Sequence, residues 1–441
     1  MPKGIGHILT NEAAERFAFY GLVSIQTVFM VNYLTKPGGE PANLSEEKAM
    51  EWLHLFKAVV YCLPLLGALI SDIFLGKFRT IIIFSVLYCV GFVVTVLDQS
   101  YIGIAVGWSL IALGTGLIKA CISANVGDQF GKDNKHLISK VYGWFYFSIN
   151  LGAFISMALV PKVLDKYGPK VAFGVPGVFM MIAVAAYWTG RKKFVHVPAG
   201  GVGFIKKTFS AKGFLANIKG LLVVAKLFLC IYIFVAVFWA LFDQTTTKWV
   251  MQAENMDLHF MGITFLPSQL QAVNPLLVMV MIPLFQFVIY PAMGKVFKVT
   301  PLRKIGIGFF VGACAFAVSA WIESQIVADL KPNIGWQIVA YVIITAAEIM
   351  ISITVLEFSY TQAPPKMKSF ISSVSLLSIS LGNVFVMYVN KFIQNPDGTS
   401  KLEGADYYWF FVKATIVTAV VFAIVTFFYR EKTYIQGETE D

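Results

Sequence analysis

Charged residues are scarce in this chain. Only 14% of its 441 residues are charged, while 57% are hydrophobic, and the mean hydropathy is +0.71. Soluble proteins carry roughly 25% charged residues, so the composition excludes an ordinary soluble protein and indicates an integral membrane protein. A net charge of +10 could suggest nucleic-acid binding. Basic cytoplasmic loops explain that charge better in a membrane protein, and we predict no nucleic-acid partner.

Several chemical motifs are also missing. The five cysteines form no C-x-x-C pair, so the sequence predicts neither a disulfide framework nor a zinc site. No G-x-x-x-x-G-K-[ST] loop is present, and neither are H-E-x-x-H and G-x-S-x-G. We therefore predict no enzymatic activity, no metal and no cofactor, and any transport would have to run on an ion gradient.

Long apolar runs dominate the rest of the sequence, and each is long enough to cross a bilayer as a helix. We predict twelve spans, at 14–34, 53–74, 80–97, 102–126, 142–163, 169–189, 221–244, 272–293, 302–322, 336–357, 369–390 and 407–429. The longest connection, 191–220, is basic and separates six spans from six. The predicted fold is an all-α membrane protein with six-helix bundles at 1–190 and 221–441, joined by a cytoplasmic linker.

The distribution of basic residues predicts the orientation. With an even number of spans, both termini lie on one side of the bilayer. About twenty-one Lys and Arg fall on that side and about nine on the other. We therefore expect both termini to be cytoplasmic.

The first span opens with a cluster of charges. Glu12, Glu15 and Arg16 are three and four residues apart, so they share one face of a helix. Charge inside a span is costly and usually marks a polar pathway within the protein. Deep charges recur in later spans at Lys119 and Asp243, each costing roughly 2.5–3.5 kcal/mol if it faced lipid. We expect these residues to line a shared interior.

The second span carries titratable residues at its start and end. His54, Lys57 and Tyr61 share one face; they could mark a solvated helix end, or His54 could carry a proton. At the other end, Asp72 is disfavoured at a helix C-terminus unless a base pairs with it, and basic residues follow closely. The stretch G-A-L-I-S-D-I-F-L-G-K-F-R resembles the loop signature of the major facilitator superfamily. The resemblance implies a cytoplasmic gate formed by Asp72, Lys77 and Arg79.

Five stretches together resemble the proton-dependent oligopeptide transporters. N-E-A-A-E-R-F-A-F-Y-G is similar to their E-x-x-E-R-F-x-Y-Y-G motif. G-T-G-L-I-K with G-D-Q-F, F-Y-F-S-I-N-L-G, F-W-A-L-F-D-Q and L-E-F-S-Y-T-Q-A-P follow in the family's order. The resemblance covers nearly every span and is closest to animal-type members. The short loops suit a bacterial protein, so we expect an inner-membrane location.

The resemblance implies roles for particular residues. Those matching the family's substrate cavity are Tyr20, Tyr61, Lys119, Tyr146, Asn150, Trp239, Asn274 and Glu348. Those matching its proton-coupling groups are Glu12, Glu15, Arg16, His54 and Asp243. In this scheme Glu348 meets a peptide's amino terminus, and Lys119 meets its carboxylate and links to the first cluster. For Asn150, a simple interhelical hydrogen bond is the alternative.

One departure from the family affects the expected substrate. Val23 stands where the family's peptide transporters usually have an arginine that grips the carboxylate, and Lys57 is a candidate replacement. The implied function is proton-coupled symport of di- and tripeptides by a monomer in the lipid bilayer. The alternatives are a carrier of nitrate, histidine or another amino acid, and a membrane receptor that binds without transport.

Overall fold

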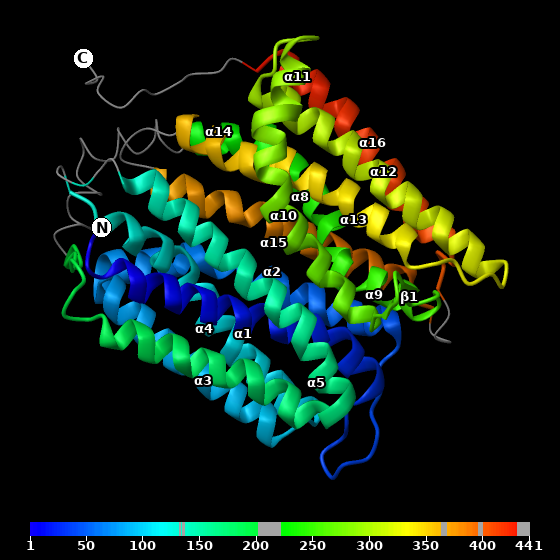
Figure 1. Ribbon diagram of the computed structural model, residues 1–441, viewed down its shortest axis with the longest axis horizontal. Helices are drawn as coiled ribbons and strands as arrows, with labels where there is room; N and C mark the ends of the chain where they lie inside the picture. The colour runs from blue at the N-terminus through cyan, green and yellow to red at the C-terminus, as the bar shows by residue number, and fades with distance from the viewer. Residues whose placement is uncertain (132–133, 135–136, 202–221, 363–367, 396–399, 430–441) are drawn as a thin grey trace. The chain divides into compact units, whose positions relative to one another are not determined.

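The computed structural model describes residues 1–131, 134, 137–201, 222–362, 368–395 and 400–429 (Figure 1). These residues are helical apart from loops and the short strands β1 (His259–Phe260) and β2 (Ile263–Thr264). The helices of the first half are α1 (Ile5–Asn32), α2 (Glu46–Ile70), η1 (Ser71–Leu75), α3 (Lys77–Leu97), α4 (Tyr101–Asp128) and α5 (Ile138–Thr189). Those of the second half are η3 (Phe228–Tyr232), α8 (Ile233–Phe242), η4 (Asp243–Thr246), α9 (Lys248–Glu254), η5 (Pro267–Ala272), α10 (Val273–Leu284), η6 (Phe285–Ile289), α11 (Tyr290–Gly294), α12 (Pro301–Val327), α13 (Gly335–Glu348), η7 (Ile349–Ile353), α14 (Thr354–Gln362), α15 (Lys368–Ile393) and α16 (Ala405–Phe427).

Two compact units make up the chain. Unit 1 comprises Met1–Phe204, Thr246–Met251 and Ile263–Leu276. Unit 2 comprises Ile205–Thr245, Gln252–Gly262 and Leu277–Asp441. Each unit therefore has its own core, and two short segments of the second half belong to the first unit. Part of the predicted linker 191–220 lies outside the described residues.

In unit 1 the first five long helices pack side by side, with α1 against α5 and α4 against α2 and α3 (Figure 1). Small residues bring α3 and α4 together. A Cβ at Gly107 or Gly114 would overlap Thr95 or Tyr88 of α3, so these glycines allow the two helices to approach closely. In unit 2, α12 packs on α13 and α16, and α8 packs on α15.

Within the described residues, ten helical stretches are long and apolar enough to cross a membrane. One of them, Lys140–Thr189, contains both predicted spans 142–163 and 169–189. Gly168, with φ 77°, interrupts the helical backbone between them, a conformation that glycine adopts without a steric penalty. Helix α1 is not among the ten, and it is the helix that carries the first charged cluster.

Candidate functional site

The charged cluster of α1 is buried in unit 1. Glu12, Glu15 and Arg16 are exposed by only 4%, 0% and 5%. Arg16 forms ion pairs with both acids, and its Nε lies 3.1 Å from Glu12 Oε1. From α4, Thr115 Oγ1 donates a hydrogen bond of 2.9 Å to Glu15 Oε1. One arginine thus pairs with two buried carboxylates, and a hydroxyl group ties the cluster to a second helix.

Lys119 lies one turn beyond Thr115 on α4 and meets two aromatic rings. Its Nζ is 4.6 Å from the ring centroid of Phe19 and 4.8 Å from that of Tyr61. Cation–π contacts of this length stabilise a partly desolvated ammonium group. Lys119 also interacts electrostatically with Glu12. Side chains from α1, α2 and α4 therefore converge here around one lysine.

The titratable face of α2 contacts a segment from far along the sequence. His54 Nε2 lies 3.2 Å from Thr247 Oγ1, and Lys57 Nζ donates to Thr246 Oγ1 at 2.7 Å. The hydroxyl group of Thr27 on α1 donates to the carbonyl oxygen of Thr246 at 3.0 Å. We call the segment 246–251 the threonine segment. Within unit 1, residues of α1 and α2 contact two consecutive threonines of this segment, Thr246 and Thr247.

Asp243 lies in unit 2, where it begins the 3-10 helix η4. It is 7% exposed, and its Oδ2 accepts a hydrogen bond of 2.6 Å from Asn383 Nδ2 of α15. One turn earlier, Trp239 packs edge-on against Phe242. A residue of α15 thus contributes a hydrogen-bond donor to this buried acid.

The remaining predicted cavity residues are distributed over both units. Unit 1 contains the half-buried Tyr20 and Asn274, the exposed Tyr146, and the buried Asn150, whose amide donates to the Tyr146 carbonyl oxygen at 3.0 Å. Glu348 in unit 2 is half-buried and ends α13. The next five residues form the π-helical turn η7, a distortion that is frequent at functional sites.

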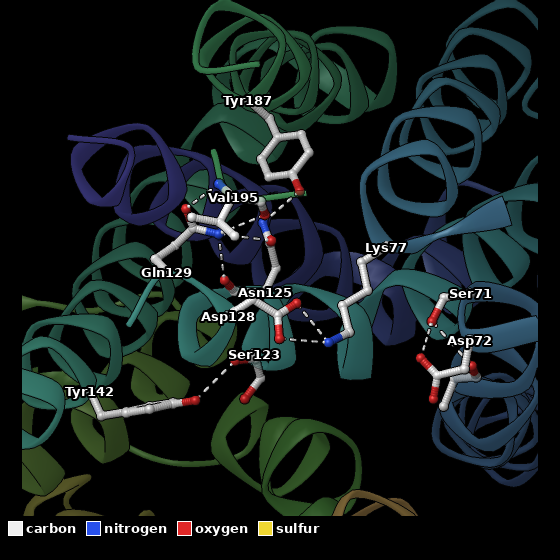
Figure 2. Close-up of polar contacts among 11 residues, drawn as sticks. Ser71, Asp72, Lys77, Ser123, Asn125, Asp128, Gln129, Tyr142, Tyr187 and Val195 are labelled. Carbon is white, nitrogen blue, oxygen red and sulfur yellow. Dashed lines mark hydrogen bonds and ion pairs between the residues drawn. The ribbon is translucent and has the colours of Figure 1, made fainter. Parts of the chain in front are cut away.

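The predicted gate residues lie at the end of α2 and the start of α3. Lys77 Nζ pairs with Asp128 of α4, at 2.7 Å from Oδ2 and 2.9 Å from Oδ1 (Figure 2). Asp72 instead accepts a hydrogen bond of 3.2 Å from Ser71 Oγ, and Arg79 is exposed. The base that follows Asp72 in sequence is thus paired with a different acid, contributed by α4.

A neighbouring network of hydrogen bonds holds the segment that follows α5. Gln129 Oε1 accepts from the Val195 amide at 2.9 Å, and Gln129 Nε2 donates to the Val195 carbonyl at 3.4 Å (Figure 2). Asn125 Nδ2 donates to Tyr187 Oη at 2.7 Å. The Gly200 amide donates to the Asp72 carbonyl at 2.7 Å. The end of α4 therefore fixes residues 195–200 beside the gate residues.

Replacing Gln129 by leucine is expected to release this segment. Two hydrogen bonds to Val195 are lost, each worth about 0.5–1.5 kcal/mol, so tryptic cleavage at Arg191–Lys193 should accelerate about tenfold. Cleavage sites are followed by mass spectrometry on the purified protein. Gln129→Glu keeps the acceptor for the Val195 amide and should give an intermediate rate. Equal rates for both variants and the parent would show that Gln129 does not hold the segment.

Comparison with known proteins identifies the family to which this chain belongs. A family model described as the POT family matches residues 78–212 and 202–410. The chain belongs to the POT family. A solved structure, described as an auto-inhibited POT family peptide transporter, is 30% identical, with a TM-score of 0.85, and covers 100% of this chain and 99% of its own. The all-helical, major-facilitator-like fold of POT transporters is therefore the fold of this chain.

Two curated relatives of the POT chain come from animals. "Peptide transporter family 1" of Drosophila melanogaster is 34% identical over 74% of this chain and 48% of its own length. "Solute carrier family 15 member 2" of Danio rerio is 34% identical over 74% of this chain and 50% of its own length. The chain spans about half the length of these relatives. The POT family consists of integral, multi-pass membrane transporters, and it is not a family of enzymes.

Some partners in the POT chain were missed by sequence reasoning. Thr115 is four residues before Lys119, so helical spacing alone could have indicated a shared face. Thr246 and Thr247 follow Asp243 closely, and their run of hydroxyl groups was the available signal. Asn383 gave none, since a single amide in an apolar helix does not reveal its partner.

Proposed function

We propose that this POT chain is a proton-coupled symporter of di- and tripeptides that works by alternating access. The observation that carries the proposal is the buried cluster of Glu12, Glu15 and Arg16, joined to α4 through Thr115. Buried groups that change protonation couple transport to a proton gradient. The neighbouring Lys119 links this cluster electrostatically to the proposed peptide site.

The substrate follows from the chemistry of the site and from the relatives. A peptide is a zwitterion, so it needs a base at one end and an acid at the other. Lys119 is the base proposed for the carboxylate, and Glu348, with Asn150 and Asn274, is proposed for the amino terminus. Tyr20, Tyr61, Tyr146 and Trp239 complete the proposed cavity. Two relatives at 34% and 30% identity are described as peptide transporters.

The proposed topology has twelve spans in two six-helix bundles, 1–190 and 221–441. Besides the ten apolar stretches, α1 crosses the bilayer, and α5 crosses it twice with the break at Gly168. The basic loops put the termini, the linker and the gate of Asp72, Lys77 and Arg79 on the cytoplasmic side. The threonine segment then faces outside. We propose a monomer in a bacterial inner membrane.

A second candidate function keeps the mechanism and changes the solute. Val23 is 1% exposed on α1 and offers no charge where peptide transporters of the family usually carry an arginine. A site with one fewer cation could suit nitrate, histidine or another amino acid. Competition between solutes separates this reading from peptide transport.

Uptake into proteoliposomes tests both candidates. An acidic exterior or an inside-negative potential should each drive accumulation of labelled dialanine. Unlabelled tripeptides should compete, whereas nitrate and histidine should not. A melting-temperature screen with the same solutes reports binding independently of transport. Accumulation indifferent to both gradients would refute proton coupling, and competition by nitrate or histidine alone would favour the second candidate.

A further inference from the structure

Lys57 is a buried cation for which the family motifs assign no role. It lies on α2, is 3% exposed, and has no counterpart in the motifs quoted above. A buried ammonium group is costly unless hydrogen-bond acceptors surround it. Its bond of 2.7 Å to Thr246 Oγ1 is short, as charge-assisted hydrogen bonds are.

The surrounding contacts make this bond one of a set on the threonine segment. His54, one turn earlier on the same face of α2, contacts Thr247. Thr27 donates to the backbone carbonyl of Thr246. Thr246 is also the last residue of η4, the turn that begins at Asp243. His54 and Lys57 on α2 therefore contact the residues that directly follow Asp243, the acid proposed to carry protons.

We infer that Lys57 is a positioning residue that anchors the threonine segment on α2, and that it is not a clamp for the substrate carboxylate. The effect of this anchor on transport rests on the proposed function. In the proposed orientation the segment lies on the outer side of the carrier. The bond of Lys57 keeps the segment packed on α2 within unit 1, and release of the segment would expose it to the outside. Lys119, whose ammonium group lies over Tyr61, keeps the proposed role of carboxylate clamp.

Accessibility of the threonine segment tests the anchor directly. Val250 lies within the segment and is 2% exposed. In a parent with its native cysteines replaced, V250C should react slowly with a membrane-impermeant maleimide added outside. Adding K57M or T246V should each raise the labelling rate about tenfold. K57R, which keeps a cationic donor, should raise it by less than K57M.

The double variant K57M/T246V should label no faster than either single variant, because both remove the same bond. Lys48→Met is the matched control: this partly exposed lysine of α2 pairs with Glu51 of the same helix at 2.8 Å. Exposed pairs contribute little, so labelling should change less than about twofold. If K57M does not fold, T246V still removes the contact and leaves the ammonium group in place.

Transport kinetics separate the anchor from the clamp. As an anchor, K57M should lower the maximal rate of dialanine uptake with KM changed less than about twofold; a clamp would raise KM about tenfold at an unchanged maximal rate. Unchanged labelling in K57M and T246V, with or without a higher KM, would overturn the inference. Labelling does not require transport. Wild-type protein that fails to accumulate dialanine would refute the proposed function while leaving the anchor standing.

Discussion

Arg16→Gln is expected to abolish dialanine uptake and to lower the free energy of unfolding by about 3–5 kcal/mol, the cost of stranding one side of a buried ion pair. Arg16 forms ion pairs with both Glu12 and Glu15, and both acids are almost fully buried. Removing it leaves two like charges together in a site that water hardly reaches. Thermal unfolding in detergent gives the stability, and proteoliposome uptake gives the transport.

A charge-neutral cluster separates folding from coupling. The combined variant E12Q/E15Q/R16Q replaces all three charges with amides that hydrogen-bond one another and Thr115. Its melting temperature should recover part of the loss seen in R16Q, because the two neighbouring carboxylates are gone, while Lys119 loses its electrostatic interaction with Glu12. Proton-driven uptake should stay absent, since the cluster no longer titrates. A melting temperature of R16Q equal to wild type would show that the two acids are already neutral.

The α1 cluster shows what sequence reasoning can reach. Its three members lie within five residues of one helix, so the period of the helix fixes their shared face. The same argument predicted that His54, Lys57 and Tyr61 share one face of a helix. Apolar runs of sufficient length predicted an all-helical membrane fold, which membership in the POT family confirms. Local periodicity and hydropathy need no knowledge of tertiary contacts.

The partners across helices were beyond that reasoning. Lys77 pairs with Asp128, 51 residues away, although Asp72 is far closer in sequence. Which acid a base reaches depends on how α3 lies against α4, and that packing is set by small residues spread along both helices. The contact of Lys57 with Thr246 joins residues 189 positions apart. Such pairings depend on the fold of unit 1, and no periodicity encodes them.

Asp243→Asn is expected to uncouple dialanine uptake from the proton gradient while leaving exchange of peptide across the membrane. Asparagine cannot release a proton, yet its carbonyl oxygen can still accept the hydrogen bond that Asn383 donates to Asp243 at 2.6 Å. One coupled charge is worth about 2.3 kcal/mol at 100 mV. That corresponds to an accumulation ratio of about fiftyfold. At this inside-negative potential without a pH gradient, D243N should equilibrate near a ratio of about one, and counterflow of labelled dialanine should persist.

Asn383→Leu is the matched control for this result. It keeps the carboxyl group of Asp243 and removes only the amide donor, so one buried hydrogen bond is lost while the proposed coupling group stays in place. We expect N383L to reach nearly the wild-type accumulation ratio, but more slowly. Proton coupling fixes the ratio at equilibrium, whereas the amide of Asn383 affects only the rate of uptake. If D243N still concentrated dialanine at 100 mV, Asp243 would not be the coupling group. The buried cluster of Glu12, Glu15 and Arg16 would then have to carry the coupled proton.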